Sequence, residues 1–319
     1  MTGEERDAAP LAIAVLIPCH NEAGAIGGVV GGFRTALPGA TVYVYDNNSS
    51  DDTPGVAARA GAVVRRERQQ GKGHVVRRMF ADVEADVYVL VDGDGTYDAS
   101  AAPRLVELLL DERLDMVNAR RVDGGESTYR RGHRFGNRLL TGIVARLFGR
   151  RFDDMLSGYR VFSRRFVKSF PALSTGFETE TELTIHALSL AMPVGEFPTR
   201  YVERAAGTAS KLRTVRDGVR ILGTILQLTK EERPLLFFSV GFAGLAALSV
   251  TLALPVVIEW LRTGLVPRFP TAILSASIML LAFLSLASGI ILGSVTRARR
   301  EIRRLQYLSV PWLGDRRQT

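Results

Sequence analysis

Two long stretches without a charged residue constrain the fold of this 319-residue chain more than any other feature. They cover residues 235–258 and 271–296. Each exceeds the roughly 20 residues that a helix needs to cross the hydrocarbon core of a bilayer. A pair of buried core helices is the alternative, but uncharged stretches of this length are typical of membrane spans. We therefore expect a transmembrane hairpin at 235–296.

Basic residues flank the expected hairpin and predict its orientation. Six lysines and arginines lie between Lys211 and Arg233, the segment RARREIRR (297–304) follows the second stretch, and the connecting loop has only Arg262 and Arg268. The positive-inside tendency then places the N-terminal domain and both termini in the cytoplasm, as in an integral protein of an inner or plasma membrane. Residues 213–234 would form an amphipathic interfacial helix and 297–319 a basic cytoplasmic tail.

The N-terminal part has the pattern of an α/β domain, predicted over residues 11–212 after a disordered segment at 1–10. Residues 1–10 are polar and acidic, unlike a signal peptide, and the single Cys19 suits a reducing compartment. The candidate strands alternate with helical stretches and lie at 11–17, 41–45, 62–65, 86–91 and 115–119. This alternation predicts a Rossmann-like, mainly parallel sheet covered by helices. A dinucleotide-binding domain is disfavoured, because G-x-G-x-x-G is missing after the first strand and Glu22 would repel a pyrophosphate there.

Acidic residues follow two of these strands. The strand at 86–91 is followed directly by Asp92, Gly93, Asp94 and Gly95. In open α/β sheets ligands bind at the carboxyl ends of the strands, and two carboxylates one residue apart can hold Mg²⁺ or Mn²⁺ with phosphate oxygens completing the coordination. A solvated Asp-Gly turn is the alternative. Asp46 ends the strand at 41–45, where it could accept hydrogen bonds from a base or a ribose.

Five motifs in order produce a resemblance to a known family. They are IPCHNE (17–22), YDNNSSDDT (45–53), GKGH (71–74), VDGDG (91–95) and DMLSGYRVFSR (154–164). Together with the hairpin they resemble glycosyltransferase family 2, and within it the dolichyl-phosphate mannose synthases and bacterial polyprenyl-phosphate glycosyltransferases. The resemblance covers about residues 11–212 and implies a GT-A fold. It also implies inverting transfer of a sugar from a UDP- or GDP-hexose to a polyprenyl monophosphate.

The resemblance also implies which residues bind the donor. The nucleotide-sugar contacts would be Pro18, Asn21, Glu22, Asp46, Asn47, Gly71, Lys72, Asp92, Gly93 and Asp94. Asp92 and Asp94 would bind the metal. Many relatives carry a glutamine two places after the second aspartate, whereas this chain has Thr96, which leaves the coordination open there. Asp98 could take that place through a water molecule.

The acceptor side is implied in the same way. The catalytic residues would be Asp154, Asp94, Arg204 and Lys211, and the acceptor phosphate would meet Arg134, Arg138, Ser157, Arg160, Arg204 and Lys211. Asp154 would orient the acceptor or take its last proton, although a phosphate with a second pKa near 6 needs little base catalysis. Arg204 and Lys211 could instead be positive-inside anchors, and Ser157 could be structural. Of Glu178, Glu180 and Glu182, the last best matches a recurrent family glutamate.

Two basic amphipathic stretches suggest contact with a bilayer. Residues 129–151 carry seven arginines beside an apolar stripe at helical spacing, and a second such stretch covers 214–230. Such helices lie on anionic membrane surfaces, or else pack their apolar stripe on a core. The net charge of +8 also fits nucleic acid, but no basic motif with interleaved aromatic residues is present. We therefore expect a nucleotide sugar, a polyprenyl phosphate and the lipid bilayer as partners, and no nucleic acid.

Other functions fit less well. A processive polysaccharide synthase would carry Q-x-x-R-W and more spans, and a nucleotidyltransferase would carry a glycine-rich N-terminal loop ending in arginine. A transferase acting on another membrane glycan or lipid, or a catalytically inactive membrane scaffold of the same fold, stays open. The sequence also leaves open whether the donor carries UDP or GDP, which sugar is transferred, how long the polyprenol is and which pathway is served. The oligomeric state is open as well, and a homo-oligomer is one possibility.

Overall fold

The computed structural model describes residues 11–123, 142, 152–173, 179–202, 227 and 230–312. They fall into two compact units, one within Met1–Asp217 and Arg303–Thr319 and the other within Gly218–Ile302. The amphipathic helices predicted over 129–151 and 214–230 lie, except for three single residues, outside the described residues.

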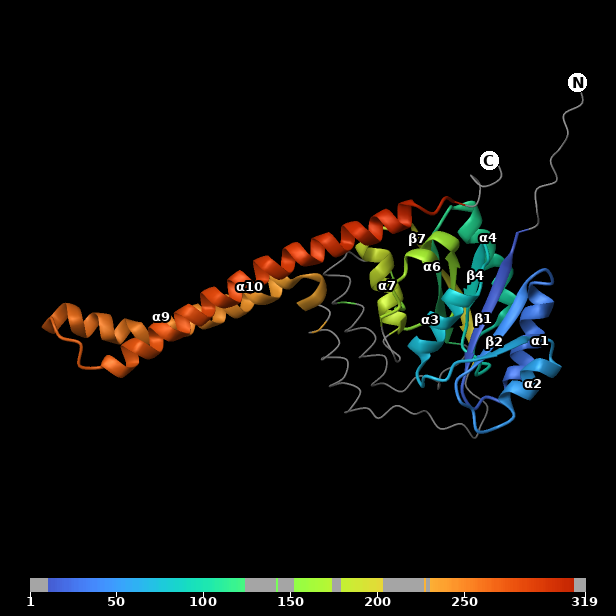
Figure 1. Cartoon of the computed structure of the whole chain (residues 1–319), viewed down its shortest axis with the longest axis horizontal. Helices are drawn as coiled ribbons and strands as arrows, with labels where there is room; N and C mark the ends of the chain where they lie inside the picture. The colour runs from blue at the N-terminus through green and yellow to red at the C-terminus, as the bar shows by residue number, and fades with distance from the viewer. Residues whose placement is uncertain are drawn as a thin grey trace, which may run out of the picture. The chain divides into compact units, whose positions relative to one another are not determined.

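In the first unit, seven strands of the described residues form one mixed sheet in the order β3-β2-β1-β4-β6-β5-β7 (Figure 1). The strands are β1 (Ile13–Cys19), β2 (Thr41–Asp46), β3 (Val63–Arg66), β4 (Val87–Leu90), β5 (Met116–Asp123), β6 (Arg160–Ser163) and β7 (Val194–Tyr201). Only β6 is antiparallel to its neighbours, β4 and β5. The predicted α/β, mainly parallel, GT-A-like sheet is confirmed, and each of the five predicted strands overlaps an observed one.

Helices cover both faces of the sheet because its central strands are apolar on both faces. They are α1 (Ile26–Ala36), α2 (Thr53–Arg59), α3 (Lys72–Asp82), η1 (Ala99–Ala101), α4 (Ala102–Asp111), α6 (Arg164–Ser169) and α7 (Thr179–Ser189). On one face, Val15 and Ile17 of β1 pack with Phe33 of α1 and Leu105 of α4. On the other face, the ring of Phe80 in α3 meets Phe162 of β6. Burial on both faces explains why these strands read as continuous apolar runs.

The second unit contains two long helices that run side by side (Figure 1). They are α9 (Pro234–Thr263) and most of α10 (Phe269–Leu308), which enclose the predicted spans. Ser249 Oγ donates to the Ser275 carbonyl oxygen at 2.7 Å, and Ser285 Oγ to the Phe238 carbonyl oxygen at 3.1 Å. By length and composition, both helices are long and apolar enough to cross a membrane.

The last turns of α10 and the residues after them, 303–312, belong to the first unit, and we call them the C-terminal clasp. Tyr307 Oη donates to the buried carboxylate of Asp115 at 2.8 Å. The guanidinium of Arg165 lies 4.9 Å from the ring centroid of Tyr307 and 4.7 Å from that of Trp312. Trp312 also packs against the hydrophobic core of the sheet. The clasp therefore packs on a charged pair, Arg165 with Asp115.

Candidate active site

The carboxyl ends of β1, β2 and β4 bring four predicted acidic residues together. In the sheet Cys19 of β1 is paired with Asp46 of β2, and Leu16 of β1 is paired with Leu90 of β4. Burial raises the pKa of the Cys19 thiol, and the nearby charges of Glu22, Asp46, Asp92 and Asp94 raise it further. Four carboxylates therefore lie near the thiol of Cys19 at this edge.

Pro18 and Glu22 lie at this edge as predicted from their motif. Pro18 is opposite Tyr45 in the β1–β2 pairing. The backbone N–H of Glu22 donates to Thr53 Oγ1 at 2.8 Å, and its carbonyl oxygen accepts from Ala25 at 3.0 Å at the start of α1. The backbone of Glu22 is thus fixed on both sides, and it joins the start of α1 to the first residue of α2.

The DGDG turn is held by contacts that require its glycines and Thr96. Asp94 Oδ1 accepts hydrogen bonds from Thr96 N at 3.1 Å and from Thr96 Oγ1 at 2.6 Å. Gly95 has φ of +74°, which favours glycine. At Gly93 a Cβ would lie 2.5 Å from Cys19 Sγ, so no side chain fits. Thr96, which replaces the glutamine of many relatives, therefore orients the carboxylate of Asp94.

Lys72 reaches into the same edge from the first residue of α3. Its ammonium donates to Asp92 Oδ1 at 2.5 Å and also to Glu180 Oε1 in the first turn of α7. Burial alone would lower the pKa of Lys72, but Asp92 and Glu180 outweigh it and raise that pKa. Burial raises the pKa of Asp92, and Lys72 only partly offsets this because Glu180 and Asp94 raise it too. Lys72 therefore stays charged beside Asp92 and Glu180.

Asn47 and Asn21 shape the loops around the site through their side chains. Asn47 is 4% exposed; its Nδ2 donates to the carbonyl oxygens of Glu67 and Gln69 at 3.0 and 2.7 Å, and its Oδ1 accepts from Gly71 N at 2.8 Å. Asn21 has φ of +56°, and its Oδ1 accepts from Ser50 N at 2.7 Å. Asn47 therefore fixes the loop that precedes Lys72, and Asn21 ties together the loops after β1 and β2.

Asp154 forms an ion pair that is largely shielded from solvent and that the sequence did not reveal. Arg121 of β5 donates from Nε and Nη2 to the two oxygens of Asp154 at 2.7 and 2.8 Å. The guanidinium of Arg121 also stacks 5.4 Å from the ring centroid of Tyr201, which contacts the ring of Tyr97. Tyr97 Oη in turn accepts from Gly158 N at 2.7 Å. These contacts link Asp154 to the strand end next to Asp92.

Ser157 and Arg160 are fully enclosed, which leaves their predicted contact with the acceptor phosphate unsupported. Ser157 Oγ donates to the Ala119 carbonyl oxygen at 2.6 Å. Arg160 is 1% exposed and donates to the carbonyl oxygens of Ser157 and Met155 and to Thr184 Oγ1, at 3.1, 2.5 and 2.8 Å. These bonds give both side chains a structural role in holding the DMLSGYR loop.

The other predicted acceptor-side residues, Arg134, Arg138, Arg204 and Lys211, lie outside the described residues. Glu178 does as well. Glu182, which we favoured from the sequence, accepts a hydrogen bond from Leu173 N at 2.8 Å. Glu180 joins the site through its contact with Lys72. Asp98 caps η1 by accepting from Ser100 N at 2.9 Å.

Within the described part of the chain, no group of three or more His, Cys, Asp or Glu side chains is arranged to hold a metal ion. The protein residues that fit a hard divalent cation are the two carboxylates of Asp92 and Asp94, whose oxygens are of the type that Mg²⁺ and Mn²⁺ prefer. Such a pair leaves the remaining coordination positions to the oxygens of a diphosphate.

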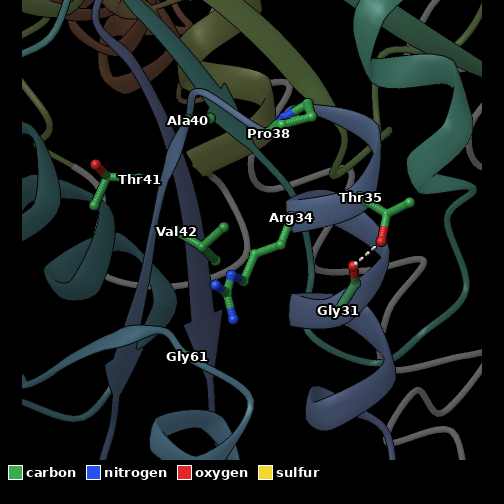
Figure 2. Close-up of a pocket in the computed structure, with 8 residues that line it drawn as sticks. All are labelled: Gly31, Arg34, Thr35, Pro38, Ala40, Thr41, Val42 and Gly61. Carbon is green, nitrogen blue, oxygen red and sulfur yellow. Dashed lines mark hydrogen bonds between the residues drawn. The ribbon is translucent and has the colours of Figure 1, made fainter.

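A hollow elsewhere in the surface is a poor candidate for the site. It lies between the end of α1 and the start of β2, at the amino ends of the parallel strands (Figure 2). Two of its polar side chains are already bonded, since Arg34 donates to the Ala60 carbonyl oxygen at 2.9 Å and Thr35 to that of Gly31 at 3.0 Å. No acidic residue lines it.

The chain is similar to known glycosyltransferases. Residues 14–170 match the family described as Glycosyl transferase family 2. Glycosyltransferase AglJ of Haloferax volcanii is 35% identical over 253 residues, 79% of this chain and 83% of that protein. The dolichyl-phosphate hexose transferase of the same organism is 30% identical over 222 residues, 69% of this chain and 95% of that protein.

The fold has solved counterparts. One is glucosyl-3-phosphoglycerate synthase from Mycobacterium tuberculosis in complex with Mn²⁺, UDP and phosphoglyceric acid. It superposes with a TM-score of 0.57 at 23% identity, over 70% of this chain and 78% of that one. The relatives and the sheet agree, and the chain belongs to glycosyl transferase family 2.

Proposed function

We propose that this glycosyltransferase transfers a hexose, with inversion, from UDP- or GDP-hexose to a polyprenyl monophosphate at the cytoplasmic face of a membrane. The observation that carries the proposal is the cluster of Asp92, Asp94 and Lys72 at the carboxyl edge of the sheet, in a chain with two helices long enough to cross a bilayer. The relative named dolichyl-phosphate hexose transferase supports the lipid acceptor. The neighbour with Mn²⁺ and UDP supports a metal and a nucleotide donor.

We assign the donor to the four-carboxylate edge. Asp92 and Asp94 would hold Mg²⁺ or Mn²⁺, which supplies positive charge against the leaving nucleoside diphosphate. Asp46 would accept from the base or ribose, and Pro18, Asn21 and Glu22 would line the nucleotide. Gly93 leaves room beside Cys19, and Gly71 with Asn47 places Lys72. In this assignment Asn47 acts by holding a loop and not by touching the nucleotide.

We assign the acceptor to the side of Asp154. Arg121 and Asp154 form an ion pair, and we propose that this pair orients the lipid phosphate. That phosphate is already an anion at neutral pH, so positioning and charge stabilisation carry more of the rate than proton removal does. Arg134, Arg138, Arg204 and Lys211 stay our predicted contacts of the phosphate. The amphipathic stretches and a transmembrane α9–α10 hairpin would keep this side against the bilayer.

A turnover assay on the detergent-purified full chain tests the proposal. The assay offers a panel of UDP- and GDP-sugars, a polyprenyl phosphate and Mg²⁺ or Mn²⁺, and it reads release of the nucleoside diphosphate. We expect lipid-dependent, EDTA-sensitive release with one donor, and a loss of about 100-fold in Asp92→Asn and Asp94→Asn. The matched control Asp111→Asn, an exposed acid at the end of α4, should keep wild-type activity.

Two results would contradict the proposal. Release that needs no polyprenyl phosphate but depends on a glycan or another lipid would give the protein a different acceptor. Binding of nucleotide without any turnover, in every combination of donor and lipid, would favour the inactive scaffold.

A further inference from the structure

A buried lysine sits between two carboxylates at the donor edge, and only one of those carboxylates faces outward. The side chains of Lys72 and Glu180 are 12% and 10% exposed, whereas that of Asp92 is 30% exposed. Lys72 and Glu180 are 108 residues apart in the chain, so only the folded domain brings them together. Lys72 therefore contacts Asp92 from the protein interior, whereas part of the Asp92 side chain is open to solvent.

The charges in this cluster do not balance. Asp92 and Glu180 carry two negative charges against the single positive charge of Lys72, and Asp94 lies close enough to act on Asp92. A cation that approaches Asp92 is attracted by the carboxylates and repelled by the ammonium. At a separation of a few Å such opposing terms are of similar size, so the presence of Lys72 sets how tightly a cation binds.

We infer that Lys72 is a resident counter-ion of Asp92, kept in place by Glu180, which a divalent cation must displace from the carboxylate. This inference rests on the proposed function, because it concerns the metal and diphosphate site assigned there. Lys72 lowers the affinity of the nucleotide-free protein for the metal ion. A nucleoside diphosphate brings negative charge that neutralises the displaced ammonium, so metal and nucleotide bind cooperatively.

Glu180 gives the inference a second test, because removing its charge should change the metal affinity in the opposite direction to removing Lys72. With Lys72 removed, two carboxylates face the cation without a competitor, and metal binding becomes tighter. With Glu180 neutralised, Lys72 keeps Asp92 as its one charged partner among the residues that the structure describes, and the cluster loses a negative charge, so metal binding becomes weaker. A merely structural role for either residue predicts no such opposite signs.

The test measures Mn²⁺ binding to the detergent-purified full chain without nucleotide, by electron paramagnetic resonance of the free ion. We expect Lys72→Met to bind Mn²⁺ at least about tenfold more tightly than wild type, and Glu180→Gln to bind it several-fold more weakly. Lys168→Met is the matched control, because Lys168 pairs with Glu84 outside this cluster, and it should leave the affinity unchanged. Added UDP or GDP should raise the Mn²⁺ affinity by a larger factor in wild type than in Lys72→Met.

Unchanged or weaker Mn²⁺ binding in a folded Lys72→Met variant would overturn the inference. Should Lys72→Met fail to fold, Glu180→Gln decides by itself, since binding equal to or tighter than wild type contradicts the counter-ion. The fate of the proposed function is separate. If no donor gave turnover but the Mn²⁺ affinities shifted as expected, the proposed reaction would be refuted and the counter-ion role of Lys72 would stand. If turnover were normal but the Mn²⁺ affinities did not shift, the proposed reaction would stand and the counter-ion role would be refuted.

Discussion

Gly158→Ala is expected to push the carboxylate of Asp92 out of place without breaking the fold. A Cβ at position 158 would lie 2.7 Å from Asp92 Cγ. Non-bonded carbon atoms pack at about 3.5–4.0 Å, so the carboxylate must retreat by about 1 Å. The backbone cannot easily yield instead, because Gly158 N is bonded to Tyr97 Oη at 2.7 Å and Ser157 Oγ to the Ala119 carbonyl oxygen at 2.6 Å.

A displacement of about 1 Å in a group that positions the reacting atoms can cost about 100-fold in rate, or about 2.7 kcal/mol of activation free energy. We therefore expect kcat/KM for nucleoside diphosphate release to fall by about 100-fold, with weaker Mn²⁺ binding in the spectroscopic assay. Overpacking alone should lower the free energy of unfolding by about 1–3 kcal/mol.

Gly195→Ala separates the two effects. Its Cβ would lie 2.7 Å from Leu114 Cδ1, which is the same carbon overlap. Gly195 and Leu114 lie at the amino ends of β7 and β5, on the edge opposite the carboxylates. This control should lose a similar amount of stability and keep its turnover and Mn²⁺ affinity. If Gly158→Ala kept kcat/KM within about threefold of wild type, our placement of Asp92 at the reacting diphosphate would be refuted.

Three further predictions concern stability. His186 is buried, and this burial, with a smaller effect of Arg303, lowers its pKa to about 3. Between about pH 6.5 and 3 the unfolded chain therefore binds a proton at this histidine that the folded chain does not, so stability should fall as the pH drops through this range. His186→Leu should flatten this part of a curve of Tm against pH. Gly28→Ala should raise the free energy of unfolding by about 1 kcal/mol in chemical denaturation, because Gly28 is exposed within α1 and a Cβ there meets nothing within 4 Å. Tyr307→Phe should lower that free energy by about 1.5–3 kcal/mol, since it removes a hydrogen bond to the buried, charged Asp115, and an unchanged Tm would contradict the clasp.

The part of the site that could be predicted from sequence consists of residues at the carboxyl ends of strands. Asp46, Asp92 and Asp94 each come just after an apolar run, and a parallel sheet brings such positions to one edge whatever the details of packing. Strands β6 and β7 were not among the five predicted strands, and nothing in a four-residue strand such as β6 shows which way it runs. Its neighbours β4 and β5 determine that direction.

The part that could not be predicted depends on helical phase and on burial. Glu180 and Glu182 are two residues apart in the first turn of α7, so a small change in where the helix begins decides which carboxylate meets Lys72. Arg160 was predicted to contact the acceptor phosphate because the motif around it resembles that of the family. Three acceptors from the DMLSGYR loop and α7 satisfy it inside the protein, and only tertiary structure reveals them.

The C-terminal clasp has a consequence for the order of events during biosynthesis. Asp115 and Tyr307 are 192 residues apart, and both apolar helices lie between them. A ribosome makes the chain from the N-terminus, so Asp115 and Arg165 emerge before Tyr307 and Trp312, and their contacts form only after the last apolar helix has been synthesised. Synthesis of the two apolar helices and formation of the contacts at Asp115 are thereby coupled in time, and a nascent chain stalled before residue 303 lacks the hydrogen bond from Tyr307 to Asp115.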